Sequence, residues 1–383
     1  MNIKSLLLGS AAAMIAVSGA RAADAVVVAE PEPAQYVKVC DVYGAGYFYI
    51  PGTETCLRIG GYVRYDIGVG DAGTFDGVNH VPDHMGGDTH STYYKNTRFT
   101  LKTWTGQETE LGTLKTYTET RFNFGNSSGD YLGAGSDWQG RNKSLSLRYA
   151  WIQLGGLRVG KDDTAFDTFV GYAGNVIQDT IVPYGGQESN VVQYYFDAGS
   201  GFSGLVSLEE GAGSVGTIDS YVPHVVGGLK YKGDWGAITG VAAYDSNYEE
   251  VAGKVRVDVI VSKELSLFVM AGYGTNDNLT DPSNSINAKG RGFYKQWGGN
   301  WAIWGGGTYK FNNKTAFNAQ ISYDDWKNLG IAANIAYTIV PGYTITAEVD
   351  YQNVGNDTPL NSVWAGATKK SNIGGILRFQ RSF

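Results

Sequence analysis

The sequence has little of what a membrane-spanning helix, a disulfide scaffold or a nucleic-acid-binding protein requires. Its 383 residues include two cysteines, nine prolines and 17% charged residues, and acidic side chains outnumber basic ones by 37 to 30. No apolar run of about 18 residues occurs, which excludes a transmembrane helix. The net negative charge excludes the basic footprint of a nucleic-acid-binding protein.

The two cysteines, Cys40 and Cys56, have no competitor for pairing. In an exported chain we expect them to form a disulfide around "DVYGAGYFYIPGTET", which the chain-entropy account values at about 3 kcal/mol. A metal site or a catalytic thiol is the alternative. It is disfavoured because no histidine lies near either cysteine in the sequence.

The N-terminus has the form of a secretory signal peptide. Residues 1–22 contain an early cation at Lys4, an apolar stretch from Leu6 to Val17 and a small-residue cleavage site that ends at Ala22. Without this segment the chain has 28 basic and 37 acidic residues, a net charge of −9. Residues 23–56 show no strand or helix pattern before the cysteines, and we expect them to form a periplasmic N-terminal segment.

The rest of the chain is rich in glycine and aromatic residues, with 54 Gly, 26 Tyr, 15 Phe and 9 Trp. In "YTITAEVDYQ" apolar and polar side chains alternate, and this period of two predicts a β-strand. The same device recurs sixteen times. The predicted strands are 57–69, 92–105, 112–124, 143–154, 156–161, 191–197, 202–210, 222–231, 235–245, 251–261, 264–274, 297–309, 314–323, 328–339, 343–353 and 371–383.

Short turns such as "GG", "KGD" and "VPG" alternate with long connections such as 162–190 and 275–296. An even number of strands with this alternation is typical of an outer-membrane β-barrel. Hydrocarbon offers no partner for a backbone amide, so a sheet spans a membrane only when it closes on itself. The prediction is an all-β fold, a 16-stranded antiparallel transmembrane β-barrel over residues 57–383.

The last strand places Ile373, Leu377, Phe379 and Phe383 on one side. In a barrel this side faces lipid, and Phe383 lies at the rim where aromatic side chains form the interfacial girdle. Arg381 shares the outward side, and near the rim its long side chain can reach the headgroups.

Three blocks of the sequence are also familiar: "CDVYGAGYFYIPGTETCLRIGGYVRYD", "LRYAWIQLGGLRVGKDD" and the terminal "ILRFQRSF". Through them the mature chain resembles the general porins of alphaproteobacteria, of the kind found in Brucella, Bartonella and Rhizobium relatives. The resemblance implies a homotrimer with one pore per barrel, a third loop folded inward, and Phe383 read by the barrel-assembly machinery. It also implies contact with outer-membrane lipid and lipopolysaccharide. One position departs from the family pattern: Arg381 stands near the terminus where such porins usually have an apolar residue.

The third long loop, about 161–190, is the candidate pore constriction, because connections of this length are uncommon and usually have a function. Its acidic residues are the predicted acidic side of the constriction: Asp162, Asp163, Asp167, Asp179 and Glu188. The turn Pro183-Tyr184-Gly185-Gly186 resembles the proline-aromatic-glycine-glycine turn of enterobacterial porins. Tyr184 stands where that family has a glutamate, which leaves open which carboxylate lines the pore.

Strand parity predicts the opposite, basic wall. Four arginines fall on the lumen side of the first four strands: Arg64, Arg98, Arg121 and Arg148. Arginine suits a charged wall because it stays ionised at any working pH. The alternative is that these side chains are merely solvated, as polar lumen residues are in any barrel. Four further cations point inward but are ranked lower, closer to the periplasmic end: Arg58, Lys102, Lys115 and Arg378.

Other motifs carry little weight. Two G-x-G-x-x-G matches, at Gly68 and Gly211, open no helix of a βαβ unit. The segment "HVPDHMGGDTH" contains His80, His84 and His90 in no known ligand spacing, so we expect an exposed loop and no metal site. No cofactor motif and no nucleophile with an adjacent base stands out, and we expect no enzyme.

The predicted function is passive diffusion of small hydrophilic solutes and ions across a Gram-negative outer membrane. We expect a weak cation preference from the acidic chain. The four arginines of the basic wall oppose this preference. A substrate-specific sugar channel is the first alternative, but the inward aromatics Tyr62, Trp104 and Tyr117 are expected to be scattered and not stacked. A structural or adhesive barrel is the second, and no passenger domain is evident.

Overall fold

The structure is a computed structural model that describes residues 38–127, 138–355 and 370–383. Every strand described lies in one compact unit, Val39–Phe383. The predicted signal peptide, residues 1–22, lies outside the described residues. None of the described helices is long and apolar enough to cross a membrane.

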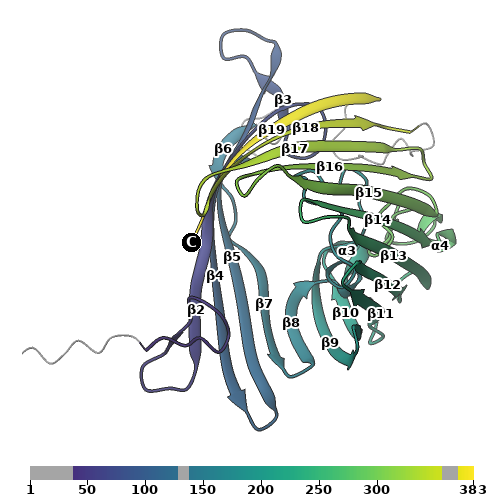
Figure 1. Ribbon diagram of the computed structural model, residues 1–383. Coiled ribbons are helices and arrows are strands. Elements are labelled where there is room, and N and C mark those ends of the chain that lie inside the picture. Colours follow the sequence, from purple (N-terminus) through teal and green to yellow (C-terminus); the bar gives the residue numbers. More distant parts are fainter. Residues whose placement is uncertain (1–37, 128–137, 356–369) are drawn as a thin grey trace, which may run out of the picture. The chain divides into compact units, whose positions relative to one another are not determined.

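Sixteen antiparallel strands form a closed barrel, as predicted (Figure 1). Consecutive strands pair around the ring, and the last strand, β19, pairs with the first, β2, through partners such as Phe379 and Tyr65. The sixteen strands are β2 (Cys56–Gly70), β4 (Thr89–Thr109), β5 (Gly112–Ser127), β7 (Ser146–Leu154), β8 (Leu157–Asp163), β9 (Glu188–Gly199), β10 (Phe202–Gly211), β11 (His224–Gly233), β12 (Gly236–Asp245), β13 (Glu250–Ile260), β14 (Leu265–Gly274), β15 (Trp301–Lys310), β16 (Thr315–Asp324), β17 (Leu329–Val340), β18 (Tyr343–Asn353) and β19 (Ser371–Ser382).

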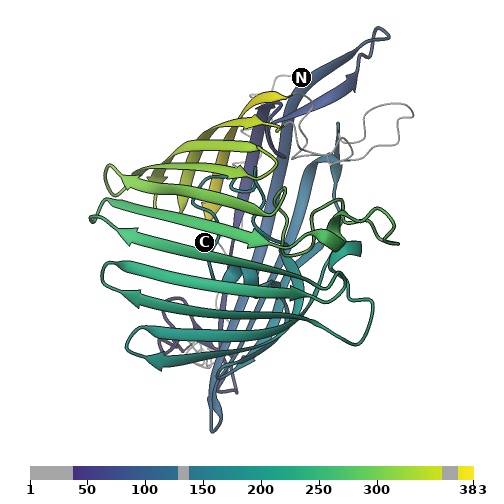
Figure 2. The ribbon, with the colours of Figure 1, turned by 90° about the vertical axis from the view of Figure 1, so that its right-hand side faces the viewer.

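Six short elements in the described part of the chain lie outside the barrel strands and are absent from the prediction. Three are strands: β1 (Phe48–Tyr49), β3 (Gly77–Pro82) and β6 (Gln139–Asn142). Three are four-residue helices: α2 (Ala165–Thr168), α3 (Gly213–Gly216) and α4 (Asp277–Thr280). Segments this short show too few repeats for a period to emerge. β3 pairs with the first part of β4, and the two form a hairpin that projects beyond the other strands (Figure 2).

The outer face of the barrel is apolar, as the alternation predicts. Side chains such as Val255, Ile303 and Val349 are 44–64% exposed, which is the pattern of a surface that meets lipid. In β19, Ile373 and Leu377 share this face, and Phe383 is exposed at its end. Arg381 donates a hydrogen bond to the Pro341 carbonyl oxygen at 2.9 Å, so it turns back to the neighbouring turn.

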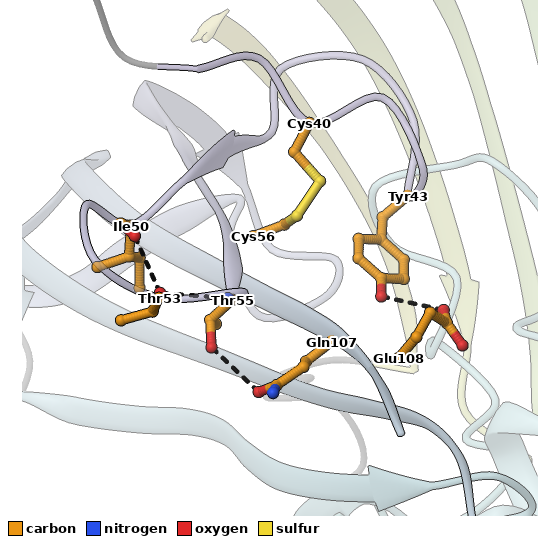
Figure 3. The surroundings of a disulfide bond; sticks show 8 residues. All are labelled: Cys40, Tyr43, Ile50, Thr53, Thr55, Cys56, Gln107 and Glu108. Atoms are coloured by element: carbon orange, nitrogen blue, oxygen red, sulfur yellow. Dashed lines mark hydrogen bonds between the residues drawn. A yellow bond between two sulfur atoms is a disulfide. The ribbon is translucent and has the colours of Figure 1, made fainter. Parts of the chain in front are cut away.

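The predicted disulfide is confirmed. Cys40 and Cys56 are bonded and nearly fully buried (Figure 3). Beside it, the Tyr43 hydroxyl donates to a carboxylate oxygen of Glu108 at 3.0 Å, and Thr55 bonds the Gln107 side chain at 3.2 Å. These contacts tie residues 40–55 to the end of β4.

The inner face departs from the uniformly polar lumen that the alternation predicts. Along β10–β15 it carries apolar side chains that are almost completely buried, including Leu205, Val241, Met270 and Trp304. They pack in one cluster with Phe166, Val182 and Tyr184 of the third long loop. One side of the inner face is therefore a hydrophobic core.

Candidate pore constriction

The third long loop, residues 164–187 between β8 and β9, is named the constriction loop. It begins with α2, where the Thr164 side chain accepts a hydrogen bond from Phe166 N and caps the helix. Glu209 of β10 accepts hydrogen bonds from Thr164 Oγ1 at 2.6 Å and from Ala165 N at 2.8 Å. Both of these buried donors therefore have a protein partner, as buried polar groups require. The start of the loop is thus fixed to β10.

An ion pair holds the next part of the loop. Lys254 Nζ of β13 lies 2.5 Å from Asp167 Oδ1, and both side chains are fully buried. Lys254 also donates to the Tyr184 carbonyl oxygen at 2.9 Å and lies 4.1 Å from the centre of the Phe166 ring. Burial raises the pKa of the Asp167 carboxyl, while the ammonium group opposes that shift. A buried pair of this kind is costly to break from one side.

The Pro183-Tyr184-Gly185-Gly186 turn packs directly on this pair. A Cβ at Gly185 would lie 2.3 Å from Asp167 Oδ1, so the position requires glycine. The Tyr184 side chain is buried and donates its hydroxyl hydrogen bond to Asp179 Oδ2 at 2.6 Å. Burial raises the pKa of Asp179 to about 7. The residue that replaces the glutamate of related turns is therefore a packing residue.

The tip of the loop is bound by β18. Glu348 accepts hydrogen bonds from Ile177 N at 2.6 Å and from Gln178 N at 2.8 Å. The Gln178 side chain donates to Asp76 Oδ1, at 3.0 Å, in the connection between β2 and β3. Between these points, Trp304 donates to the Val182 carbonyl oxygen at 2.8 Å. The contacts run across the inner side of β10–β18, which is named the covered wall.

The remaining part of the inner face is named the open wall: the inward side chains of β19, β2, β4, β5, β7 and β8. Three of the predicted arginines come together there. Arg64 and Arg98 are direct partners across β2 and β4. Arg98 Nε donates to Asn123 Oδ1, and Arg121 Nε to Glu119 Oε1, both at 2.7 Å.

Two further cations belong with these arginines. The sequence ranks Arg378 lower, but its Nε lies 2.7 Å from Asp66 Oδ1, and Arg64 Nε lies 3.3 Å from the other oxygen of the same carboxylate. Arg158 is missing from the prediction. It donates to Asp162 Oδ2 at 2.7 Å. Its alternation with the apolar Leu157 and Val159 places it on the inner face, so the signal for Arg158 is present in the sequence.

The fourth predicted arginine has a different environment. Arg148 has no partner in β5, because the register shifts between Glu119 and Thr120. This bulge lets Arg148 and its neighbour Tyr149 both turn inward. Arg148 binds both carboxylate oxygens of Asp163, which also accepts hydrogen bonds from Tyr149 at 2.8 Å and Tyr172 at 2.6 Å. Arg148 is therefore engaged at the start of the constriction loop.

The predicted acidic residues do not form one acidic side. Asp162, Asp163 and Asp167 are at most 4% exposed, and each is paired with a cation. Glu188 has the same strand parity in β9 as the exposed side chains of Val192 and Tyr194, and it pairs with Lys161 at 2.7 Å. Glu188 lies directly opposite Asp163 across β8 and β9, and its Oε1 is 3.8 Å from Nη1 of Arg148, the arginine that binds Asp163.

Two of the three inward aromatics expected to be scattered, Trp104 and Tyr117, are stacked on each other, which corrects the prediction for this pair. Trp104 and Tyr117 are partners across β4 and β5, with ring centres 5.3 Å apart. Tyr117 continues to Trp151 at 5.7 Å and to Tyr149 at 5.6 Å. These four rings are named the aromatic belt. Guanidinium groups cover its two ends, Arg58 at 4.5 Å from the Trp104 ring and Arg158 at 4.0 Å from the Trp151 ring.

The first long loop shows one weak pair, His90 Nε2 at 3.6 Å from Asp83 Oδ2. Within the described parts of the chain, no group of three or more His, Cys, Asp or Glu side chains has the geometry to hold a metal ion.

Comparison with known proteins places this barrel among porins. Residues 24–376 match the porin subfamily. The whole chain is 48% identical to the whole of porin Omp2b from Brucella suis biovar 1. Among solved structures, the outer membrane channel DcaP of Acinetobacter baumannii superposes with a TM-score of 0.57 at 15% identity, covering 88% of this chain and 99% of that one. An anion-selective porin from Comamonas acidovorans gives 0.51 at 14%, covering 86% and 100%. At these identities the two structures support the fold alone.

Proposed function

Since this chain belongs to the porin subfamily, as a general porin of the alphaproteobacterial kind, we propose that the constriction loop and the open wall together form its solute filter. The protein is a general diffusion channel for small hydrophilic solutes in a Gram-negative outer membrane. Selection among such solutes depends on the dimensions and the charges of the lumen.

The course of the constriction loop carries the proposal. Its hydrogen bonds at Glu209, Lys254, Trp304 and Glu348 all lie on the inner side of the strands. A loop held there occupies part of the lumen and narrows the passage beside it. Solutes then pass between the loop and the open wall, and those too large to fit are excluded.

The sign of the charge at this passage depends on which groups are already paired. On the covered wall Asp167 is neutralised by Lys254, and at the start of the loop Asp163 is neutralised by Arg148. The open wall carries more cations than carboxylates: Arg58, Arg64, Arg98, Lys102, Lys115, Arg121, Arg158 and Arg378 against Asp66, Glu108, Glu119 and Asp162. We therefore propose a preference for anions at the passage, in place of the weak cation preference expected from composition.

Three partners remain proposals that family membership supports. They are assembly into a homotrimer, insertion by the barrel-assembly machinery through Phe383, and contact of the outer face with lipopolysaccharide. A signal peptide cleaved between Ala22 and Ala23 belongs to the same set. Passive diffusion requires only a shaped, charged passage, and we propose no catalytic role.

Single-channel recording in planar bilayers tests the filter. We expect open channels whose reversal potential in a KCl gradient shows anion preference. The double change Arg98→Gln and Arg121→Gln removes two charges from the open wall and is expected to move the reversal potential toward cation preference. Lys314→Gln, in the exposed turn between β15 and β16, removes a charge outside the lumen and is the matched control. A reversal potential that the double variant leaves unchanged would overturn the proposed filter.

A further inference from the structure

We propose that the open wall holds a binding site for small organic anions that carry a ring, such as a carboxylate attached to an aromatic ring. The inference deepens the proposed function and rests on it, because it names a class of solute that the filter retains on its way through. Three observations carry it: the aromatic belt, an excess of hydrogen-bond donors beside the belt, and a cavity between the two.

The aromatic belt is built by strand register. Trp104 faces Tyr117 across β4 and β5, and Tyr117 faces Trp151 across β5 and β7, so the rings lie at one level of the barrel. Neighbouring ring centres are 5.3 and 5.7 Å apart, within the range of attractive ring contacts. Rings held in this way by their neighbours lose little freedom when a solute ring packs against them.

Hydrogen-bond donors beside the belt exceed the acceptors available to them. The Glu119 carboxylate accepts from the Tyr117 hydroxyl at 2.7 Å and from Arg121 Nε at 2.7 Å, and Lys102 Nζ lies 3.3 Å away. One carboxylate thus serves two cations and a hydroxyl. A guanidinium group has five N–H donors and an ammonium group three. The donors that Glu119 leaves unfilled are those that a carboxylate or phosphate recognises.

A cavity of about 440 Å³ lies between these groups. Its lining combines rings of the belt, including Tyr117, Tyr149 and Trp151, with the cations Lys102 and Arg121. Tyr62 closes it on the side of β2, with Lys102 Nζ 5.6 Å from its ring centre. The volume falls in the range of small-molecule sites. A single-ring acid fits this space.

The chemistry of the lining selects both parts of the ligand. Flat apolar faces favour a ring, because a flexible chain gains less contact for the freedom it loses. Lysine and arginine favour a negative charge, and the acidic partners Glu119 and Asp162 are already bonded to Arg121 and Arg158. A ring without charge, or a charge without a ring, satisfies only half of the site.

The test uses three probes on the full-length channel in planar bilayers: benzoate, acetate and benzyl alcohol, each at millimolar concentration in the presence of KCl. We expect benzoate to interrupt the current at concentrations where the other two have no effect. Trp151→Leu removes a ring of the lining, and Lys102→Met removes a charge. Each is expected to raise the half-blocking concentration of benzoate by roughly threefold or more, given the usual strength of ring and cation contacts.

Tyr94→Leu is the matched control, because it removes an inward ring outside the belt, from β4, the strand that also contains Lys102. It should leave the block by benzoate unchanged. Equal effects of benzoate and acetate in an open, anion-preferring channel would overturn the binding site while the proposed filter stands. A channel without anion preference would overturn the filter itself, and a block that survives both Trp151→Leu and Lys102→Met would place any benzoate site elsewhere.

Discussion

The covered wall and the open wall are built by the same alternation of side chains, but they differ in how their charges are held. On the covered wall the Lys254 and Asp167 side chains are both fully buried and bonded to each other. On the open wall Arg121 remains 24% exposed, and Lys102 remains 27% exposed, beside the one carboxylate that they share. Buried charges must be paired, whereas charges beside water need no partner.

The difference separates two roles within one lumen. The covered wall fixes the constriction loop through a hydrophobic cluster and a few buried polar contacts. Its charges hold the loop in position. In the proposed filter the open wall faces the passage, and its charges act on solutes. We therefore expect substitutions on the covered wall to change stability and pore size, and substitutions on the open wall to change selectivity. Four predictions test this division, from the strongest effect to the weakest.

The largest effect is expected for Lys254→Met. The change leaves the Asp167 carboxylate buried without its partner, which costs about 3 to 5 kcal/mol in comparable buried pairs. We expect the free energy of unfolding to fall by that amount in urea titrations of the folded barrel, and the single-channel conductance to become larger and unsteady as the loop detaches. The division would fail if Lys254→Met altered ion selectivity but neither conductance nor stability.

The second prediction concerns pH and the tip of the constriction loop. Burial raises the pKa of Asp76 to about 7 from an ordinary value of 3.8, and the nearby Glu348 carboxylate acts in the same direction. Because the folded protein holds this proton more tightly than the unfolded chain, stability falls as pH rises from about 4 to about 7, by at most about 1.4 kcal/mol per pH unit for one proton. Above about pH 7 the stability that the Asp76 proton contributes is fully lost.

Urea midpoints measured from pH 4 to pH 8 check this expectation. In Asp76→Asn the side chain no longer titrates, so the pH dependence should become less steep over the same window, where Asp179 still contributes. Wild-type and variant curves that remain parallel would show that Asp76 does not hold the proton.

The third prediction concerns Glu348→Gln. The amide keeps one acceptor oxygen for the two backbone N–H groups of Ile177 and Gln178, so one buried donor loses its partner at a cost of about 1 to 3 kcal/mol. Hydrogen exchange should show roughly tenfold or greater loss of protection at these two amides. Glu264→Gln, in the exposed turn between β13 and β14, is the control. Equal protection of the two amides in both variants would contradict the proposed role of Glu348 in holding the loop.

The smallest effect on stability is expected for Lys102→Met on the open wall. Glu119 keeps its hydrogen bonds from Arg121 and Tyr117, and Lys102 is a partly exposed member of the cluster, so the change should cost about 1 kcal/mol or less. Reversal potentials should nevertheless move toward cation preference. A loss of stability as large as that of Lys254→Met would remove the distinction between the two walls.

The barrel could be predicted from the order of the residues, because period two and turn lengths are local properties of the chain. The same alternation places Arg64, Arg98 and Arg121 on the inner face, and two cysteines alone leave no other choice of pairing. The sequence also indicates that the two residues that bind the loop, Lys254 and Glu348, face inward, because they alternate with the outward Val255 and Val349. Alternation gives the face on which a side chain lies, however, and not the group it meets there.

Which inward side chains are buried depends on contacts that form only in the folded barrel. The constriction loop crosses strands far from it in sequence, so contacts such as Ile177 with Glu348 join residues about 170 positions apart. Register, including the bulge at Arg148, brings Trp104, Tyr117 and Trp151 into one belt. The inner face has a single alternating pattern in the sequence, but the constriction loop buries only part of it. In the proposed filter, this burial separates the charges that hold the loop from those that meet solutes.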